Sequence, residues 1–286
     1  MSVSKAIEWG LGLLSESSES ARTDTQLMLA HAAGRPREWI VAHPEALLPA
    51  EEARAFVALC ERRRAGAPIA YLLGSAGFCG REFLVDENVL VPRPETEHLV
   101  EDAIEFIRER IYPRDRVPEV LDVGTGCGAI ACTVASETNA TVDATDVSNK
   151  ALMVAIQNAR RLGVRERCRF HEGDLVDPVR GNRYDVVIAN LPYVPSADLC
   201  QAPDPTAFEP RLALDGGPDG LALYRRLLPQ IPQLLTEEAL VLLEAAPPTI
   251  AMLKELLEIT LPNFTISVHH DYAGLARYIK ATAGVS

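Results

Sequence analysis

The sequence predicts an α/β protein with a small N-terminal helical domain, a β-hairpin linker and a mostly parallel sheet covered by helices. Three observations predict this architecture. Residues 1–73 carry apolar side chains at helical spacing, glycines punctuate short extended runs in residues 74–92, and strands alternate with amphipathic helices in residues 93–286. Strands separated by helices of this length are typical of βαβ units, whose strands pair in parallel. The length of 286 residues also favours two domains, at roughly 100–200 residues each.

Two helices are clearest in the N-terminal domain. The run 24–33 places apolar residues among polar ones at helical spacing, and it stops at Gly34. A second helix follows Pro49, with acids in its first turn and the basic run 61–64 at its end, as the helix dipole favours. We interpret this basic run as a solvated helix end.

The linker has the pattern of a β-hairpin. Two extended runs, 78–84 and 89–91, flank the polar residues 86–88, which favour an Asx-containing turn. We expect this hairpin to join the helical domain to the sheet.

The remaining chain alternates between the two kinds of element. The candidate strands are 119–123, 141–147, 168–171, 184–189, 240–244, 265–270 and 277–281. The candidate helices are 96–111, 129–136, 149–162 and 220–235. In the helix 149–162 the apolar residues form one stripe, and Ser148 is a plausible N-cap.

Composition and charge narrow the classes of function. The chain is 48% hydrophobic and 24% charged, which is typical of a globular protein. Its net charge of -12 disfavours a broad basic face for binding nucleic acid. No apolar run approaches the roughly 18–20 residues that span a bilayer, and the N-terminus has Glu8 within its apolar stretch. We therefore expect a soluble cytoplasmic protein without a signal peptide and without contact to membranes.

The six cysteines are scattered through the chain. None forms a C-x-x-C pair, so neither a zinc site nor a disulfide framework is indicated. We expect reduced thiols that are buried or partly buried, and no bound metal. These cysteines are Cys60, Cys79, Cys127, Cys132, Cys168 and Cys200.

A glycine-rich loop follows the first predicted strand of the sheet. The residues Gly124, Gly126 and Gly128 allow a sharp turn and a close approach of a ligand, and a helix begins directly afterwards. The spacing G-x-G-x-G is neither the dinucleotide fingerprint nor a P-loop. Because the loop has no phosphate-binding cradle, it fits a nucleotide-like ligand whose charges are not phosphates.

Acidic residues lie at the carboxyl ends of three successive strands. The separation in sequence between Asp122 and Asp146 is about that at which doubly wound folds have an acid that binds ribose hydroxyls. Asp143 is the competing acid, but its odd offset directs it to the other face of the sheet. Asp174 follows the third strand, where it could accept a hydrogen bond from an adenine amino group. Each acid alone could simply cap the following helix, whereas three together indicate a ligand site.

The fourth strand ends in Asn190-Leu191-Pro192-Tyr193. The Asn side chain offers an acceptor and a donor, Pro192 stiffens the loop, and Tyr193 offers a ring face. This set suits a planar substrate that carries N–H groups, either an amide or an exocyclic amine. An Asx turn with a nearby packed tyrosine is the structural alternative.

Several segments together resemble a known family. The segments VLDVGTGCGAIA (120–131) and ANLPYVP (189–195), with Asp146, are similar to class I S-adenosylmethionine-dependent methyltransferases that act on a planar nitrogen. The match narrows to the HemK/PrmC family, the protein-(glutamine-N5) methyltransferases of peptide chain release factors. The segments that narrow it are ARTDTQLMLAHAAG (21–34), GAPIAYLLG (66–74), FLVDENVLVPRPETE (83–97) and FEPRLALDGGPDGL (208–221).

The resemblance implies a Rossmann-like, seven-stranded fold and methylation of the Gln in the Gly-Gly-Gln motif of class 1 release factors. It implies that the helical domain helps to hold the release factor, and we expect a monomer. The implied cofactor contacts are Asp122, Gly124, Thr125, Gly126, Cys127, Gly128, Asp146, Asp174, Leu175 and Asn190. The implied catalytic and substrate contacts are Asn190, Leu191, Pro192 and Tyr193, with Arg93, Pro94 and Glu95 close to the site.

The sequence departs from the family pattern at two positions. Leu191 stands where the family usually has the first Pro of Asn-Pro-Pro-Tyr, and Ala246 stands where it usually has the Gly of Glu-x-Gly. We expect activity to survive the first departure, because the backbone carbonyl of residue 191 is retained.

Two other functions remain open at this stage. The tetrapeptide also resembles that of ribosomal-RNA adenine N6 dimethyltransferases, which methylate another planar NH₂ group; the charge and the segments 83–97 and 208–221 disfavour this alternative. A non-catalytic adaptor that binds a release factor without methylating it is the third hypothesis, and intact Asp146 and Asn190 disfavour it.

Overall fold

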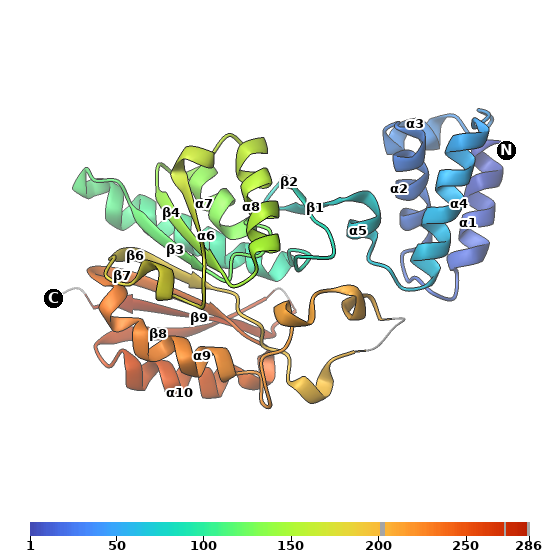
Figure 1. Ribbon diagram of the computed structural model, residues 1–286. Helices are drawn as coiled ribbons and strands as arrows, with labels where there is room; N and C mark the ends of the chain where they lie inside the picture. Colours follow the sequence, from blue (N-terminus) through green and yellow to red (C-terminus); the bar gives the residue numbers. More distant parts are fainter. Residues whose placement is uncertain (201–203, 272, 285–286) are drawn as a thin grey trace. The chain divides into compact units, whose positions relative to one another are not determined.

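The computed structural model describes residues 1–200, 204–271 and 273–284, which fall into two compact units (Figure 1). Unit 1 comprises Met1–Ala76 and the described part of Cys200–Glu209, and unit 2 comprises the described residues of Gly77–Leu199 and Pro210–Ser286. Phe208 packs against the apolar core of unit 1, so the described part of this segment belongs with the helical residues although it is distant from them in sequence.

Unit 1 is a helical bundle around one apolar core. Its helices are α1 (Val3–Leu14), α2 (Ala21–Ala33), α3 (Arg37–Ala42), α4 (Ala50–Arg64) and α5 (Ile69–Leu73). Gly34 ends α2 with a positive φ of 59°, as predicted from the sequence. The interpretation of the whole basic run as solvated is wrong at Arg63. Its guanidinium pairs with the buried carboxylate of Asp24 at 2.8 Å and holds α4 against α2.

The hairpin is shorter than predicted. Strands β1 (Ser75–Phe78) and β2 (Arg81–Leu84) form a two-stranded sheet across a turn at Cys79 and Gly80, both with positive φ. The predicted partner strand 89–91 is wrong. Asp86 accepts hydrogen bonds from both the backbone and the side chain of Asn88, and this local turn does not bring the chain back to pair.

Unit 2 is built on a seven-stranded sheet with helices on both faces. The remaining strands are β3 (Glu119–Val123), β4 (Thr141–Asp146), β5 (Cys168–Glu172), β6 (Tyr184–Ala189), β7 (Leu235–Glu244), β8 (Phe264–His270) and β9 (Ala276–Ala283). Their order is β5-β4-β3-β6-β7-β9-β8, with β9 antiparallel to both of its neighbours and the other pairs parallel. This confirms the predicted Rossmann-like fold class.

Within the described residues of unit 2, five α-helices cover this sheet. They are α6 (Glu97–Phe106), α7 (Ala129–Glu137), α8 (Asn149–Arg161), α9 (Ala222–Leu227) and α10 (Ile250–Thr260). In Figure 1, α6, α7 and α8 lie on one face and α9 and α10 on the other. A π-helical turn, Ile107–Ile111, extends α6, and Ser148 caps α8 as predicted, because its Oγ accepts a hydrogen bond from Ala151 N at 3.2 Å.

The predicted helix 220–235 is wrong in its second half. Helix α9 ends at Leu227, and two short 3-10 turns follow before β7 begins at Leu235. Pro229 and Pro232 explain the break, since proline has no N–H to donate within a helix. Strand β7 therefore begins five residues earlier than predicted, and α10 was not predicted at all.

The first strand of the sheet, β3, lies between β4 and β6, so the strand order reverses there. Val123 at its end pairs with both Thr145 and Ala189. In open α/β sheets the crevice beyond the carboxyl ends at such a reversal is where ligands bind.

Candidate active site

A cavity of about 270 Å³ lies at the carboxyl ends of β3, β4 and β6. All of its lining residues belong to unit 2. The predicted site residues that line it are Gly124, Gly126, Asp146, Asp174, Leu175, Asn190, Leu191 and Pro192. The cavity also has lining residues that the sequence patterns did not single out: Asn88, Val89, Leu90, Val123, Thr145, Val147, Ser148, Ala151, Pro210, Leu212, Ala213, Leu223 and Arg226.

The glycines of the loop after β3 have different tasks. All three have positive φ, which favours glycine. A Cβ at Gly124 would lie 2.9 Å from Leu191 Cδ2, and one at Gly128 would lie 3.0 Å from the Cβ of Ala155 on α8. A Cβ at Gly126 would have no atom within 4 Å, so this residue leaves the cavity wall open. The outer glycines therefore serve packing, and the middle one leaves room for a ligand.

Asp146 lies at the end of β4 with its carboxylate held by backbone amides. Its Oδ2 accepts a hydrogen bond from Gly126 N at 2.9 Å and its Oδ1 accepts one from Ser148 N at 2.8 Å. A carboxylate has about four acceptor positions, so one remains on each oxygen for a pair of ligand hydroxyls. Burial raises the pKa of this carboxyl, while the backbone hydrogen bonds oppose the shift.

The competing acid, Asp143, has a structural task. Its buried carboxylate binds Arg169, His171 and the hydroxyl of Tyr184. It does not line the cavity. The preference for Asp146 on grounds of strand periodicity agrees with this placement.

Asp122 lies behind the glycine loop rather than in the cavity. Its Oδ2 accepts hydrogen bonds from Thr125 Oγ1 at 2.6 Å and from Ala131 N at 3.2 Å. Within the described residues its buried Oδ1 has no partner. Full burial raises the pKa of this carboxyl to about 7. Three neighbours of the loop that were also predicted as cofactor contacts, Thr125, Cys127 and Gly128, likewise lie outside the cavity lining.

Asp174 and Leu175 lie on the third side of the cavity. Asp174 pairs with Arg226 of α9, and both side chains are about half exposed. Leu175 has an unusual positive φ of 49°, which turns the chain at the cavity wall.

The tetrapeptide after β6 is fixed by hydrogen bonds from three directions. Asn190 Nδ2 donates to Thr96 Oγ1 at 3.0 Å, and Leu191 N donates to the hydroxyl of the buried Tyr224 at 3.3 Å. The Tyr193 hydroxyl donates to Glu244 Oε1 at 3.3 Å. Two acceptors remain: neither Asn190 Oδ1 nor the Leu191 carbonyl oxygen receives a hydrogen bond from any residue that the structure describes.

The two departures from the family pattern are accommodated. Leucine at position 191 has an N–H that proline lacks, and Tyr224 accepts it. The Tyr224 hydroxyl in turn donates to the carbonyl of Glu244. Ala246 has a φ of −65°, a value open to any residue, and it does not line the cavity.

The segment 213–220 braces the tetrapeptide. Val194 N donates to Leu214 O at 3.0 Å, and Gly216 N donates to Val194 O at 2.8 Å. A Cβ at Gly216 would lie 2.7 Å from Pro192 O, and one at Gly220 would collide with Tyr193 O. The glycines of this segment thus permit a backbone contact that side chains would block.

Arg93, Pro94 and Glu95 lie beside the site but not in the cavity lining. Arg93 precedes a short 3-10 turn, Pro94–Thr96, whose last residue contacts Asn190. Glu95 pairs with Arg277 of β9 at 3.5 Å. Their role in substrate binding stays a prediction.

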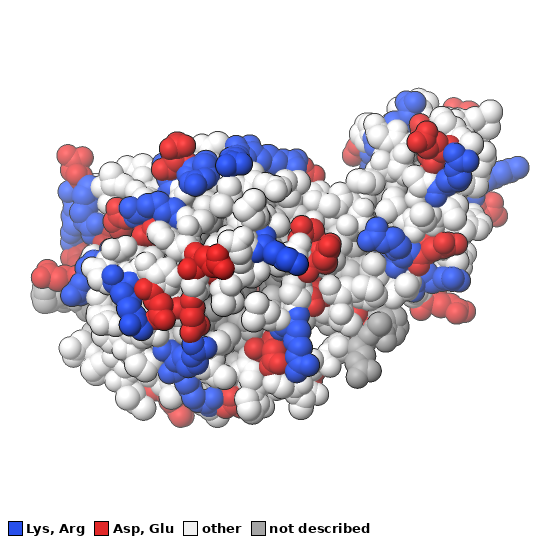
Figure 2. Space-filling view, in the orientation of Figure 1, with Lys and Arg blue, Asp and Glu red and all other residues white. Residues whose placement is uncertain are grey.

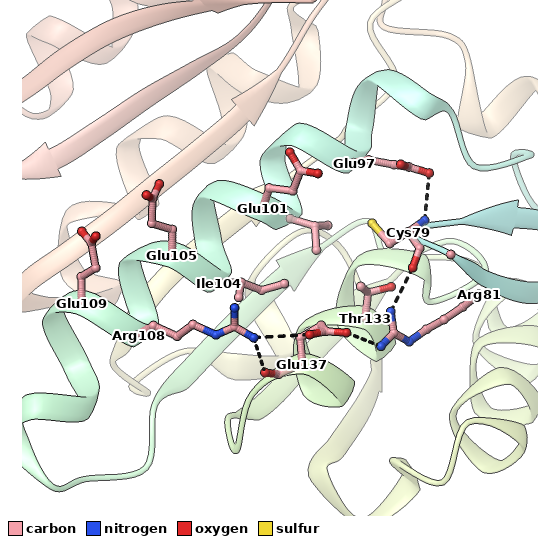
Figure 3. Close-up of a pocket in the computed structure, with 12 residues that line it drawn as sticks. Cys79, Arg81, Glu97, Glu101, Ile104, Glu105, Arg108, Glu109, Thr133 and Glu137 are labelled. Carbon is pink, nitrogen blue, oxygen red and sulfur yellow. Dashed lines mark hydrogen bonds and ion pairs between the residues drawn. The ribbon is translucent and has the colours of Figure 1, made fainter.

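A larger groove of about 740 Å³ lies between α6, α7 and the hairpin turn (Figure 3). It contains none of the predicted site residues. Glu137 pairs with Arg81 and with Arg108, which neutralises part of its charge. Burial and nearby glutamates raise the pKa of the Cys79 thiol to about 12, so this groove offers no thiolate at neutral pH.

Three further observations bear on function. Acidic and basic side chains are interspersed on the face drawn in Figure 2. Over residues 1–200, 204–271 and 273–284, no helix has the length and apolar character needed to cross a bilayer. Over the same ranges no three His, Cys, Asp or Glu side chains gather as metal ligands. Of the cysteines, Cys60, Cys127, Cys132 and Cys168 are buried as expected and Cys79 is partly buried, whereas Cys200 is exposed, contrary to the expectation.

Comparison with known families gives two matches. Residues 5–74 match the PrmC N-terminal domain, and residues 101–201 match the methyltransferase small domain.

Three similar proteins are all named release factor glutamine methyltransferase. The one from Bacillus subtilis (strain 168) is 34% identical over 281 residues, covering 97% of this chain and 96% of that protein. The one from Moorella thermoacetica is 40% identical over 265 residues, covering 92% of each chain. The one from Bordetella pertussis is 43% identical over 208 residues, covering 72% of this chain and 74% of that protein.

Solved structures share the fold of about seven tenths of the chain at low sequence identity. A methyltransferase from Pyrococcus furiosus has a TM-score of 0.54 at 19% identity, covering 73% of this chain and 92% of its own. The N-terminal domain of human METTL16 in complex with SAH has a TM-score of 0.51 at 18% identity, covering 71% of this chain and 76% of its own.

Proposed function

The chain belongs to the family of release factor glutamine methyltransferases, and on this premise we propose that it methylates the Gln of the Gly-Gly-Gln motif in class 1 peptide chain release factors. The enzyme uses S-adenosylmethionine and transfers the methyl group to the side-chain amide nitrogen. The observation that carries the proposal is a pair of acceptors, Asn190 Oδ1 and Leu191 O, that have no partner among the described residues and lie at the wall of a cavity that Asp146 also lines.

The residues of the cavity fit S-adenosylmethionine. Asp146 has acceptor positions left for the two ribose hydroxyls, and the missing Cβ at Gly126 leaves space against the loop. Asp174 offers an acceptor for an adenine amino group, and Leu175 offers an apolar surface for the ring. These four residues would hold the nucleoside end of the cofactor.

The amide of the substrate needs two acceptors. When bound, S-adenosylmethionine would supply an electrophilic methyl group; as the amide nitrogen took it up, S-adenosylhomocysteine would leave and one N–H proton would pass to solvent. A neutral amide is a weak nucleophile because its lone pair is delocalised. Asn190 Oδ1 and Leu191 O would each accept a hydrogen bond from one N–H of the substrate amide. These hydrogen bonds would increase the electron density on the nitrogen and fix its position. Alignment of this kind contributes roughly 7–11 kcal/mol in well-oriented pairs, and no ionised base is needed before transfer.

We assign the wider tasks from the same premise. Unit 1, which includes the match to the PrmC N-terminal domain, would recognise the body of the release factor. Arg93, Pro94 and Glu95 would contact the chain around the target Gln, because Arg93 precedes the turn that carries Thr96 and the other two residues are part of it. We further propose that the enzyme acts as a monomer in the cytoplasm, where peptide chain release takes place.

A transfer assay with three acceptors tests the proposal. The chain is incubated with radiolabelled S-adenosylmethionine and with a release factor, the same factor carrying Asn in place of the motif Gln, or ribosomal RNA. We expect label only on the first. Label on the RNA, with affinity falling steeply as salt is raised, would support the adenine methyltransferase alternative. Binding of the release factor without any label would support the adaptor alternative.

A further inference from the structure

We propose that Glu244, acting through Thr96, is a positioning residue that sets which end of the Asn190 carboxamide faces the substrate. This proposal rests on the proposed function and extends it to two residues that the motif does not contain. Glu244 is the last residue of β7, and Thr96 is the last residue of the turn before α6. Ala189 pairs with Leu243, so Asn190 and Glu244 leave adjacent strands at the same edge of the sheet.

Three side chains form a continuous hydrogen-bonded chain. Thr96 Oγ1 donates to Glu244 Oε2 at 2.7 Å and accepts from Asn190 Nδ2 at 3.0 Å. Thr96 and Glu244 are almost fully buried, with exposed fractions of 4% and 2%. Water is therefore largely excluded, and the proton of each donor has few alternative partners.

The direction of this chain follows from the number of protons. A threonine hydroxyl has one proton. When an ionised Glu244 takes that proton, the Thr96 oxygen has only acceptor positions left, and the NH₂ end of Asn190 is the group that can fill one. The oxygen of Asn190 is then directed away from Thr96, where it is free to accept an N–H of the substrate amide.

The second oxygen of Glu244 is also engaged. Its Oε1 accepts a hydrogen bond from the Tyr193 hydroxyl, so one carboxylate orients both the first and the last residue of the tetrapeptide. The titratable and charged groups that face it are Glu95 before α6, Tyr193 after β6, Tyr224 on α9 and Arg277 on β9. Two more charges act at the edge of this set: Asp271 pairs with Arg277 at 2.7 Å, and Arg93 lies near Tyr193.

Protonation of Glu244 would reverse the direction of the hydrogen bonds from Glu244 through Thr96 to Asn190. A neutral carboxyl can donate to Thr96, whose own proton then turns towards Asn190. The carboxamide of Asn190 would rotate to accept it and would present NH₂ to the NH₂ of the substrate, donor against donor. Burial is the largest influence on Glu244 and raises the pKa of its carboxyl to about 7, whereas Arg277 opposes this shift. Turnover should therefore rise as the pH increases through neutrality.

Four variants of the full chain separate orientation from folding. Glu244→Gln keeps the size of the side chain but never ionises, and Thr96→Val removes the hydroxyl with little change in shape. Thr96→Ser keeps the hydroxyl and is the conservative rescue. Glu237→Gln, an exposed residue at the other end of β7, is the matched control for the charge change.

The kinetic readout is kcat against pH from 6 to 8.5, with the affinity for S-adenosylhomocysteine measured by calorimetry. For the wild type and Glu237→Gln we expect kcat to fall about tenfold from pH 8 to pH 6, as one group with a pKa near 7 requires. For Glu244→Gln we expect a flat profile, with kcat roughly 10- to 100-fold lower at pH 8 and cofactor affinity within twofold. Thr96→Val should behave in the same way, and Thr96→Ser should recover most of the activity.

A second readout does not depend on turnover. The side-chain NH₂ signals of ¹⁵N-labelled Asn190 should shift with an apparent pKa near 7 in the wild type and stay constant in Glu244→Gln. A wild-type pH profile and kcat in Glu244→Gln, with its fold and cofactor affinity intact, would overturn the proposal. If release factor is not methylated at all, the proposed function fails, and a pH-independent Asn190 signal would then separately overturn the orientation by Glu244.

Discussion

The NH₂ group of Asn190 is hydrogen-bonded within the protein, whereas its carbonyl oxygen is available as an acceptor. A side chain that binds the N–H of a substrate amide needs this arrangement. Its Nδ2 is bound by Thr96, and its Oδ1 has no partner among the described residues. We expect Asn190→Ala to lower kcat by roughly 10²–10³-fold, the scale for the loss of one preorganised polar partner. Cofactor affinity measured by calorimetry should stay within a few-fold. A wild-type kcat in a folded variant would remove Asn190 from the mechanism.

Asp146 carries the prediction for cofactor binding. Its hydrogen bonds to ligand hydroxyls would be charge-assisted, at roughly 1.5–3 kcal/mol each. We expect Asp146→Ala to weaken binding of S-adenosylmethionine by at least about tenfold for each lost bond. Glu172→Ala, at the end of the neighbouring β5, is the matched control and should bind normally. Equal affinities of the two variants would contradict the assignment of Asp146.

Asp122 predicts a pH dependence of stability in the cofactor-free protein. The pKa of its carboxyl in the folded protein, about 7, lies above the ordinary value of 3.8. Its contribution to the free energy of unfolding is therefore fully present below about pH 3.8 and is lost as the pH rises through 7. Asp122→Asn keeps an oxygen for Thr125 and Ala131 and cannot ionise. Between pH 5 and pH 8 the free energy of unfolding of the wild type should fall relative to this variant, measured by urea denaturation. A constant difference between them would show that burial does not raise this pKa.

Residues at strand ends were predictable, whereas their partners were not. Asp146 and Asn190 follow apolar runs that read as strands, so their place at one sheet edge follows from parallel pairing. Thr96 and Glu244 come together only through the register of β7 beside β6 and through a turn 94 residues before Asn190. The N–H of Leu191 likewise finds Tyr224 only in the folded chain. Single-sequence patterns contain no information on such distant contacts.

At the scale of elements, Asn158 of α8 joins the hairpin to the glycine loop. Its fully buried side chain accepts from Leu84 N at 2.7 Å and donates to Leu84 O at 3.0 Å and Cys127 O at 2.8 Å. We expect Asn158→Ala to lower the free energy of unfolding by about 3 kcal/mol, because it leaves buried polar groups without partners. Cofactor affinity should also fall, since the carbonyl of Cys127 anchors the loop.

The control for this prediction lies one residue away. Gln157 is exposed on the same helix, and Gln157→Ala should change the free energy of unfolding by less than about 0.5 kcal/mol. Chemical denaturation of both variants measures the difference. Similar losses for the two would mean that α8 itself, rather than the bonds of Asn158, sets the cost.

The errors in the predicted elements have local causes. Pro229 and Pro232 lie within the predicted helix 220–235. The prediction followed the apolar periodicity of this segment and did not take into account the N–H groups that proline lacks. The residues 89–91 read as a strand because they are apolar, yet Val89 lines the cavity at the carboxyl ends of β3, β4 and β6 instead. Four strands of the parallel core, by contrast, were located within a residue or two, since buried β-branched runs bounded by turns are a strong signal.

At the scale of the whole molecule, charge and chain path carry different information. The net charge of -12 was readable from composition, whereas the interspersed arrangement of acidic and basic side chains on the face drawn in Figure 2 was not. The assignment of Phe208 to unit 1 was not readable, because a segment that interrupts one unit to complete the core of another has no local signature. The proposed division of labour, recognition by unit 1 and chemistry by unit 2, stays a prediction of the same kind.

The most direct measurement is the position of the transferred methyl group. Unmodified release factor is incubated with the enzyme and S-adenosylmethionine, and its peptides are sequenced by tandem mass spectrometry. We expect a gain of one methyl group on the side-chain amide of the Gln in the Gly-Gly-Gln motif, at a rate that Asn190→Ala sharply reduces. A methyl group on any other residue, or an unmodified motif alongside tight binding of S-adenosylmethionine, would contradict it.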